Sequence, residues 1–161
     1  MDNKKISKLR RSRGYSWEDK LVKRFNSSPN WKSFRLGSPS IALPDIVAIN
    51  NIKRTIYVME AKSGTGTTLY VPADQIIRCF HWMYNFEIYD IKLVILAFKF
   101  LSKKRLKHGQ YAKRKLKEYY KICDESNIVS CTCDYNGELY YTIDGNRHAL
   151  SLKEIKMPFF K

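Results

Sequence analysis

The chain has 161 residues, of which 44% are apolar, and it carries a formal net charge of +15. The length is typical of one domain with a core of its own, and the apolar content excludes an intrinsically disordered chain. No apolar run approaches the length of a membrane span and no apolar signal region follows the basic N-terminus, so we expect a cytoplasmic protein with no membrane partner.

The first half of the chain alternates between helical and extended patterns. Ser16 is predicted to cap a helix, because Asp19 completes a capping box. Apolar and polar residues then alternate as they do in strands, and turn-forming residues separate the runs. In chain order we expect a flexible basic arm over residues 1–13, a helix over 16–25, a strand over 31–36, a loop over 37–43 and a β-hairpin over 44–62.

The second half begins with the polar stretch SGTGTT, which predicts a flexible loop. Apolar residues at helical spacing then predict one helix after Pro72 and another within a very basic segment that Gly109 interrupts. In chain order we expect the loop over residues 63–68, an extended segment over 69–71, helices over 73–86 and within 102–125, a strand over 91–100, and a hairpin turn at Asp144-Gly145.

The hairpin over residues 44–62 brings three charged residues to one edge. If the polar stretch NNIKR forms its turn, Asp45 lies opposite Glu60. Directly opposed side chains of an antiparallel pair point to the same face, with Cβ atoms about 5 Å apart. Lys62 shares that face with Glu60, because side chains two residues apart in a strand point to the same side. We therefore expect two carboxylates and one ammonium group at a single edge of the sheet.

Two carboxylates this close repel each other, and a divalent cation resolves the repulsion. Oxygen ligands suit Mg²⁺, for which Mn²⁺ can substitute. Lys62 beside the ion can orient or deprotonate a water molecule, or stabilise charge in the transition state. Such a site would hydrolyse a phosphodiester. The alternative is a set of solvated strand ends, where a Glu–Lys pair contributes little to stability.

The net charge of +15 indicates a polyanionic partner, most often nucleic acid. Solubility and an acidic protein partner are the alternative uses of this charge. The cysteines lack the paired C-x-x-C elements of a zinc site, and intracellular disulfides are rare. We therefore expect free thiols at all four positions, Cys79, Cys123, Cys131 and Cys133.

This ordered set of motifs resembles the PD-(D/E)XK nuclease superfamily, and within it the archaeal Holliday junction resolvases. The superfamily pattern is a Pro-Asp pair, a hairpin and Glu-Ala-Lys, which here are residues 44–45 and 60–62. The narrower resemblance spans roughly residues 10–100. It includes the helix GYSWEDKLVKRF with an early acid, the loop FRLGSPS, the strands PDIVAI and YVMEAKS, and the helix VPADQIIRCFHWM, in which a Gln is followed by an aromatic residue.

The resemblance implies an α/β fold with a restriction-endonuclease-like core, in which helices flank a central mixed β-sheet. To this core we expect a basic C-terminal extension to be added, which departs from the family. It also implies a homodimer that cleaves four-way DNA junctions with Mg²⁺ and works alongside recombination proteins. On the matching positions, Asp45 and Glu60 would bind the metal, Glu18 would support it, and Lys62 would assist the water.

The resemblance also gives roles to polar residues outside the two strands. Either Ser38 or Ser40 would be the serine of a mobile loop near the scissile phosphate, and Gln75 would help to place the phosphate or the water. Each role has a structural alternative. The acid Glu18 can simply serve the positive N-terminus of its helix, the serines can be turn residues, and Gln75 can be ordinary surface.

No counterpart of the family is expected after about residue 102. We therefore divide the chain into a nuclease core with a basic N-terminal arm over residues 1–102 and a basic extension of helix and strands over 103–161, packed on the same domain. Residues expected to bind DNA phosphates are Arg10, Arg11, Arg13, Arg35, Lys103, Lys104 and Arg105. Two alternatives stay open: another superfamily nuclease of repair, restriction or viral origin, and a non-catalytic DNA-binding module on the same fold.

Overall fold

The computed structural model describes residues 3–36 and 43–160, with the side chains of residues 3–11 and 13 left outside the description. Its elements are, in chain order, α1 (Asn3–Asn26), β1 (Lys32–Arg35), β2 (Ile46–Asn50), β3 (Thr55–Gly64), β4 (Thr68–Val71), α2 (Ala73–Tyr84), β5 (Ile91–Phe100), β6 (Lys103–Arg105), η1 (Lys107–Gly109), β7 (Tyr111–Lys113), β8 (Lys117–Cys123), η2 (Glu125–Asn127), β9 (Cys131–Asp134), β10 (Leu139–Ile143) and β11 (Asn146–Leu150).

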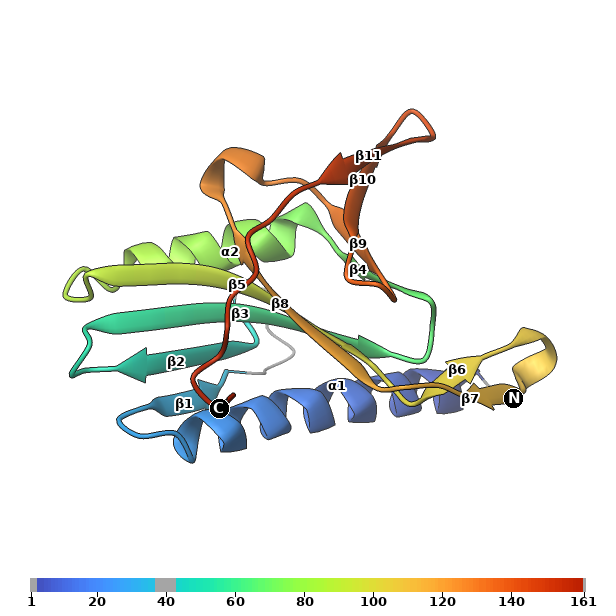
Figure 1. The fold of residues 1–161 in the computed structure, drawn as a ribbon, viewed down its shortest axis with the longest axis horizontal. Helices are drawn as coiled ribbons and strands as arrows, with labels where there is room; N and C mark the ends of the chain where they lie inside the picture. Colours follow the sequence, from blue (N-terminus) through green and yellow to red (C-terminus); the bar gives the residue numbers. More distant parts are fainter. Residues whose placement is uncertain (1–2, 37–42, 161) are drawn as a thin grey trace.

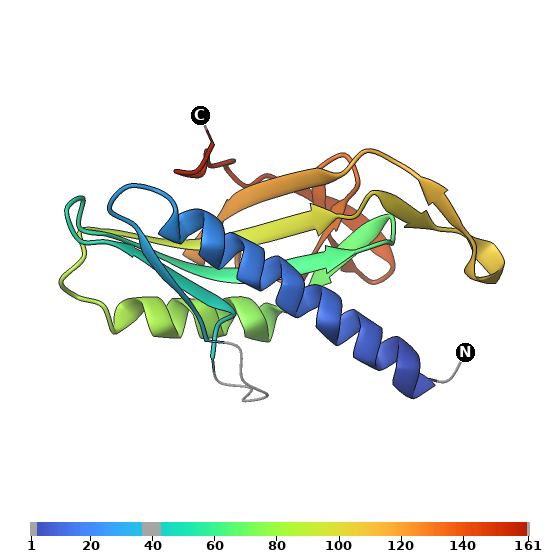
Figure 2. The same cartoon turned by 90° about the horizontal axis from the view of Figure 1, so that it is seen from below.

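A mixed five-stranded sheet, in the order β1-β2-β3-β5-β8, forms the centre of the molecule (Figure 1). β3 and β5 run parallel, whereas every other neighbouring pair in this sheet is antiparallel. One helix packs on each face (Figure 2). Met59 and Ala61 of β3 share a core cluster with Trp17 of α1, while Val58 shares the opposite cluster with Ile76 of α2. The predicted mixed sheet flanked by helices is therefore confirmed.

The β2–β3 hairpin has the register that the sequence predicts. Ile46 lies opposite Met59 and Asn50 lies opposite Thr55, which places Asp45 opposite Glu60 one step further along. In the turn, the backbone N–H of Lys53 donates to Asn50 Oδ1 at 3.0 Å. The alternation of this segment specifies the register, because a slip of one residue would turn every buried side chain to the other face.

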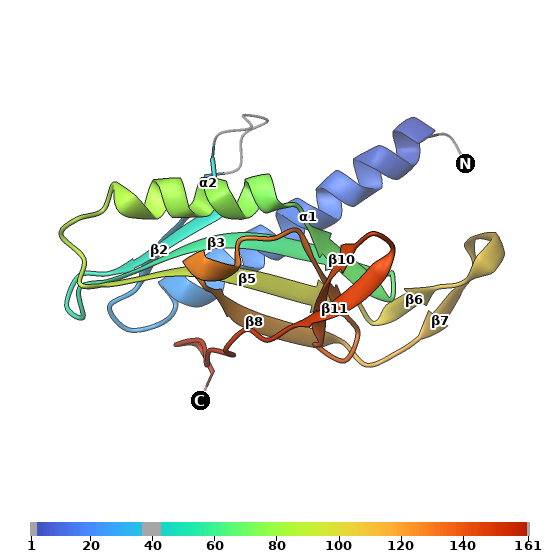
Figure 3. The same ribbon diagram turned by 90° about the horizontal axis from the view of Figure 1, so that it is seen from above.

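A second sheet, in the order β11-β10-β9-β4, stands beside the N-terminal end of α2 (Figure 3). Asp144 and Gly145 join β10 to β11 with φ values of 49° and 79°. Two positive φ angles are what a type I′ hairpin turn requires, so the predicted turn is confirmed. The four cysteines are buried free thiols, as expected.

The prediction of a flexible N-terminal segment over residues 1–13 is wrong, because α1 begins at Asn3 and includes residues 3–15. Ser16 consequently lies inside the helix and does not cap its start. The stretch before it is rich in Lys and Arg, which are good helix formers, and their propensities extend the helix past a local capping signal. Smaller differences occur elsewhere: β3 continues to Gly64, into the predicted polar loop, and α2 ends at Tyr84.

The predicted helix within residues 102–125 is also wrong. This segment forms β6, η1, β7 and β8. β8 pairs with β5 along seven positions, from Val94–Cys123 to Phe100–Lys117. Tyr119, Tyr120 and Ile122 favour strands, and pairing with β5 overrides the helical spacing that the apolar residues also satisfy. The division of the chain at residue 102 stays a prediction; β8, which follows that boundary, is a strand of the central sheet.

Candidate active site

Asp45 and Glu60 meet at the edge where β2 begins. Asp45 directly precedes β2, and its Oδ2 accepts a hydrogen bond from the backbone N–H of Ala61 at 2.8 Å. This bond holds the Asp45 carboxylate beside the residue that follows Glu60. Glu60 itself is only 1% exposed. The sheet therefore brings the two predicted acids together, one at the rim and one buried beneath it.

Two cations hold the Glu60 carboxylate. Lys62 Nζ donates to Oε1 at 2.5 Å, and Arg78 Nη2 donates to Oε2 at 3.2 Å. Lys62 follows Glu60 on the same strand, as predicted, whereas Arg78 comes from α2. Arg78 was not among the site residues predicted from the sequence. The signal that could have found it is its spacing from Gln75, because residues three positions apart share one face of a helix.

Glu18 adds a third carboxylate from α1. It is 7% exposed, and its Oε2 is buried with no hydrogen-bond partner. Burial above all, together with the negative charge of Asp45, raises the pKa of Glu18 to about 7, although Arg35 opposes the shift. The charge of Glu60 raises this pKa further, and the charge of Lys62 lowers it. The predicted acid of the first helix thus belongs to the same electrostatic cluster as the two strand acids.

The Glu60 carboxyl shows the same response to its surroundings. Burial is the largest cause that raises its pKa, to about 7, and Asp45 adds to the rise while Lys62 and Arg78 oppose it. A raised pKa for two acids means that the cluster holds more negative charge than its burial favours. Either a bound proton or a further cation would relieve that excess.

The residues fit a hard divalent cation in chemistry, although they do not form a closed metal cage. Carboxylate oxygens are the ligands that Mg²⁺ prefers, and the buried Oε2 of Glu18 has no protein partner. Among the described residues, however, no group of three or more His, Cys, Asp and Glu side chains is arranged to hold an ion. Lys62 and Arg78 each donate to one oxygen of Glu60, and because each oxygen carries a second lone pair, an ion could share this carboxylate with the two cations.

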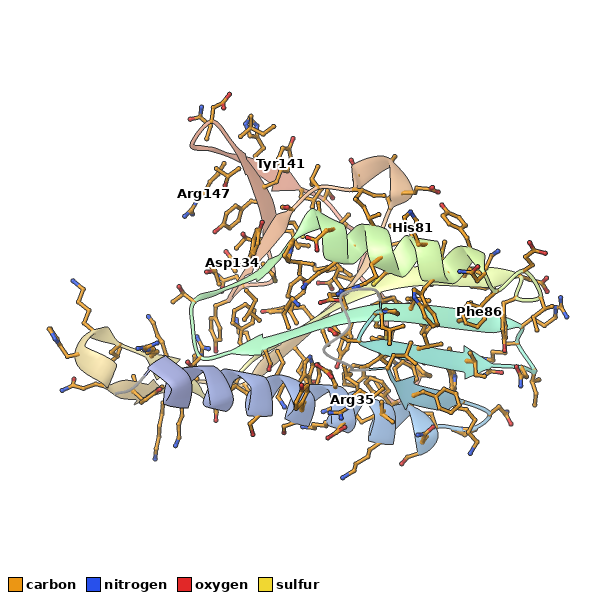
Figure 4. All side chains as sticks on the ribbon, turned by 180° about the vertical axis from the view of Figure 1, so that it is seen from behind. Arg35, His81, Phe86, Asp134, Tyr141 and Arg147 are labelled. Atoms are coloured by element: carbon orange, nitrogen blue, oxygen red, sulfur yellow. The ribbon has the colours of Figure 1, made fainter. Side chains whose placement is uncertain are left out.

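The other predicted site residues differ in where they lie. Gln75 sits in the first turn of α2, and its Oε1 is buried without a hydrogen-bond partner. Arg35, at the end of β1, pairs with Asp19 at 3.4 Å and lies over the ring of Tyr15, beside α1 (Figure 4). The predictions for Ser38 and Ser40 fall outside the described residues.

The predicted phosphate-binding residues fall on two elements besides β1. Arg10, Arg11 and Arg13 belong to α1, with side chains outside the description. The remaining three, Lys103, Lys104 and Arg105, form β6. The backbone of α1 and the β6–β7 hairpin extend toward the same end of the molecule (Figure 1). Within the described part of the chain, no helix is both long and apolar enough to cross a membrane.

Comparison with known proteins decides the family. The chain matches the family described as archaeal Holliday junction resolvase (Hjc) over residues 9–129, well over half of its length. It belongs to this family. Members of the Hjc family are nucleases that act on DNA, and they generally use a divalent metal ion. The match also corrects the expectation that resemblance to the family ends near residue 102, since it includes β8 and η2.

A solved structure supports the same fold. The Holliday junction resolvase Hjc of the archaeal hyperthermophile Archaeoglobus fulgidus is similar to this chain with a TM-score of 0.51 and 19% sequence identity. The similarity covers 77% of this chain and 85% of the Archaeoglobus chain. No curated protein sequence matches the chain significantly. β10 and β11 lie beyond the residues that match the Hjc family.

Proposed function

We propose that this member of the Hjc family hydrolyses phosphodiester bonds of four-way DNA junctions with Mg²⁺. The observation that carries the proposal is the β2–β3 register, which sets Asp45 opposite Glu60 with Lys62 bound to the latter. Glu18 adds a buried carboxylate oxygen without a partner. A chain with a net charge of +15 matches a substrate made of phosphates.

Asp45, Glu60 and Glu18 would hold the Mg²⁺ ion, for which Mn²⁺ can substitute. When bound, the ion would lower the pKa of a water molecule and offset charge on the phosphate. Lys62 lies against Glu60, where its ammonium can orient the attacking water or stabilise the developing negative charge. Arg78 keeps the second oxygen of Glu60 in a fixed direction.

Polar groups around the acids would position the DNA. Gln75 presents a buried oxygen with no partner in the first turn of α2, where it can orient water or, through its amide N–H groups, the phosphate. Either Ser38 or Ser40 would contact the scissile phosphate from the loop before Asp45. Backbone phosphates further away would bind the basic residues Arg10, Arg11, Arg13, Arg35, Lys103, Lys104 and Arg105.

A homodimer would place two such sites on opposed strands of a junction with two-fold symmetry. α2 supports this proposal, because Ile77 and Tyr84, which lie about two turns apart on the helix, both expose apolar surface, and Ile88 is exposed beyond its end. We further propose that the protein acts in the cytoplasm, alongside recombination proteins. The division into a core and a C-terminal extension at residue 102 is kept as part of the same proposal.

The test of the reaction compares purified protein on a four-way junction and on linear duplex of the same sequence, with Mg²⁺ or with EDTA. We expect cleavage of the junction only, with Mg²⁺ only, and a loss of activity of at least about 100-fold in Asp45→Asn because that change removes a ligand charge. Equal cutting of linear duplex would instead assign the broader nuclease class. Tight DNA binding without hydrolysis would assign a non-catalytic binding module.

The dimer has its own readout on a supercoiled plasmid that extrudes a cruciform. Two sites acting in one encounter convert the plasmid directly to the linear form, because the second nick follows before the junction is lost. Accumulation of singly nicked circles before any linear product would contradict the dimer and leave the hydrolytic reaction in place.

A further inference from the structure

The segment 101–116, which we call the basic arm, leaves the central sheet after β5 and returns at β8. It consists of β6, η1 and β7, and the hairpin projects away from both sheets in all three ribbon views (Figures 1, 2 and 3). The tip turns at His108 and Gly109, both with positive φ. Every residue of the arm that is charged at neutral pH is a cation: Lys103, Lys104, Arg105, Lys107, Lys113, Arg114 and Lys115.

One face of the basic arm is exposed and carries most of the cations of its two strands. Lys103 lies directly opposite Lys113, and Arg105 lies opposite Tyr111 on the same face. All four side chains are exposed, whereas Lys104 and Ala112 on the other face are partly buried. Among the described residues, no acidic side chain forms an ion pair with the cations of this exposed face.

This arrangement opposes the stability of the hairpin when it stands alone. Like charges placed directly opposite each other destabilise a strand pair, and an isolated two-stranded hairpin is only marginally stable in water. Lys103 and Lys113 therefore gain from a partner that supplies negative charge at regular spacing along an extended surface. The sugar-phosphate backbone of a nucleic-acid duplex has that chemistry.

Arg114 anchors the base of the basic arm to the strand of the active site. Its Nε donates to the carbonyl of Leu101 at 2.8 Å, and its Nη1 and Nη2 donate to the carbonyls of Gly66 at 2.9 Å and Gly64 at 3.3 Å. The guanidinium also lies 4.7 Å from the centre of the Tyr135 ring. Gly64 is the last residue of β3, the strand that carries Glu60 and Lys62.

The basic arm and the candidate active site therefore lie at the same edge of the central sheet, where β3 and β5 both end. β3 and β5 are parallel, with Lys62 paired to Phe98 and Gly64 paired to Phe100. The backbone N–H of Arg105 then donates to the carbonyl of Thr65 at 2.9 Å. At about 3.3 Å per residue, Lys103 lies at most about 20 Å along the strand from the level of Lys62. A duplex cut at the site can thus reach the arm.

We propose that the basic arm grips the backbone of the duplex that enters the active site, through phosphate contacts of Lys103, Arg105 and Lys113. Arg114 acts as a positioning residue that fixes the arm to the end of β3. The proposal rests on the proposed DNA substrate. It specifies which surface of the protein binds the DNA away from the scissile bond. These contacts would be independent of base sequence, because they reach phosphates only.

The test measures binding by fluorescence anisotropy, in EDTA so that no cleavage occurs, with labelled linear duplex and labelled four-way junction. The variant combines Lys103→Gln, Arg105→Gln and Lys113→Gln. A matched control removes three exposed lysines elsewhere, with Lys53→Gln, Lys153→Gln and Lys156→Gln, so that both variants lose the same charge. A third variant, with Lys103→Arg and Lys113→Arg, keeps the charge, and thermal melting confirms that each variant folds.

We expect the arm variant to bind both DNAs on the order of 10–100-fold more weakly at low salt. The slope of log affinity against log salt should become shallower by about 2–3 units, since each phosphate contact contributes about 0.9. The charge-keeping variant should retain the wild-type slope, and the control should retain most of the affinity. Equal losses in the arm variant and the control, or an unchanged slope in the arm variant, would overturn the proposal.

Failure of the arm and failure of the reaction are separable. Protein that binds DNA through the arm but cuts no junction would refute the proposed hydrolysis and leave the arm contact standing. If the wild type cuts junctions with Mg²⁺ and the arm variant has the same KM for DNA, the arm contact is refuted and the proposed hydrolysis stands. Wild-type protein that binds neither DNA in EDTA would refute the arm contact as well.

Discussion

Arg78 links the second helix to the most deeply buried acid of the candidate site. Its Nη2 donates to Glu60 Oε2 at 3.2 Å, while Lys62 occupies the other oxygen. Both cations lower the pKa of Glu60 against the effect of burial. The orientation and the charge of Glu60 thus depend on a residue that the short strand motif does not contain.

Replacement of Arg78 by alanine should slow junction cleavage and raise the Mg²⁺ concentration needed for half-maximal rate. Residues that orient a metal ligand typically affect metal affinity or activity by about 10–100-fold. Arg78→Lys should restore part of both parameters, because it keeps the charge. Arg54→Ala is the control, since Arg54 pairs with Asp90 at an exposed turn. An unchanged Mg²⁺ dependence in Arg78→Ala would contradict the positioning role.

We expect Glu18 to make the stability of the metal-free protein depend on pH. Its pKa is about 7 in the folded protein, against an ordinary value of 4.5. Because the folded protein binds this proton more tightly than the unfolded chain does, the stabilisation is complete below about pH 4.5 and is lost as the pH rises through about 7. In EDTA, the wild type should therefore lose stability relative to Glu18→Gln, by on the order of 1–2 kcal/mol between pH 5 and 8.

Urea unfolding of both proteins at several pH values, with and without Mg²⁺, measures this difference. Glu18→Gln removes the titrating group and is the reference for every other pH effect in the molecule. Addition of Mg²⁺ at pH 8 should stabilise the wild type more than the variant, because the cation offsets the buried charge. A difference in stability that is the same at pH 5 and at pH 8 would contradict the burial of this charge.

Among the elements, the turn between β9 and β10 is fixed by contact with the central sheet. Gly137 has a φ of 87°, and a Cβ atom at this position would lie 2.5 Å from Cε1 of Tyr119 on β8. The Tyr119 hydroxyl in turn donates to the carbonyl of Tyr135 at 3.0 Å. This close approach joins the second sheet to the edge of the central sheet.

Gly137→Ala should destabilise the fold through both the backbone and the packing. A positive φ costs about 1–2 kcal/mol for a residue with a Cβ, and overpacking against Tyr119 adds about 1–3 kcal/mol. Gly145→Ala is a matched control, because Gly145 also has a positive φ, 79°, but has no atom within 4 Å of the added Cβ. Chemical denaturation should show the larger loss for Gly137→Ala; equal losses would contradict the packing contact.

The elements that the sequence predicts correctly are those with a strong local pattern. The β2–β3 hairpin combines alternation with a polar turn, and its register follows from the residues themselves. The segment that becomes β8 satisfies helical spacing equally well, and only its pairing with β5 decides the outcome. Arg78 escaped prediction for the same reason, since its contact with Glu60 requires knowing which face of the sheet α2 covers.

At the scale of the whole molecule, two basic segments extend toward the end of the sheet that carries the candidate active site. α1 and the basic arm extend in that direction, and both carry many Lys and Arg residues (Figure 1). Lys62 and the end of β3 lie at the corresponding edge of the central sheet. A duplex bound between the scissile site and the basic arm would follow a path set by the backbone of β3 and β5.

In the proposed function, DNA binding and phosphodiester hydrolysis depend on different groups of residues. The acids are buried or held by hydrogen bonds, whereas Lys103, Arg105 and Lys113 of the basic arm are exposed. We expect mutations of the acids to change hydrolysis and mutations of the arm to change binding and its dependence on salt. The second sheet, most of which lies beyond the residues that match the Hjc family, packs against the same core.

A Mn²⁺ ion shared by Asp45 and Glu60 is the feature on which the proposed reaction depends. Anomalous diffraction from crystals grown with Mn²⁺ would locate it, with Asp45→Asn crystals as the control. The expected result is a peak between the two carboxylates in the wild type and no peak in the variant. No peak at this pair, with Glu60 still bound to both cations, would contradict the metal-dependent site.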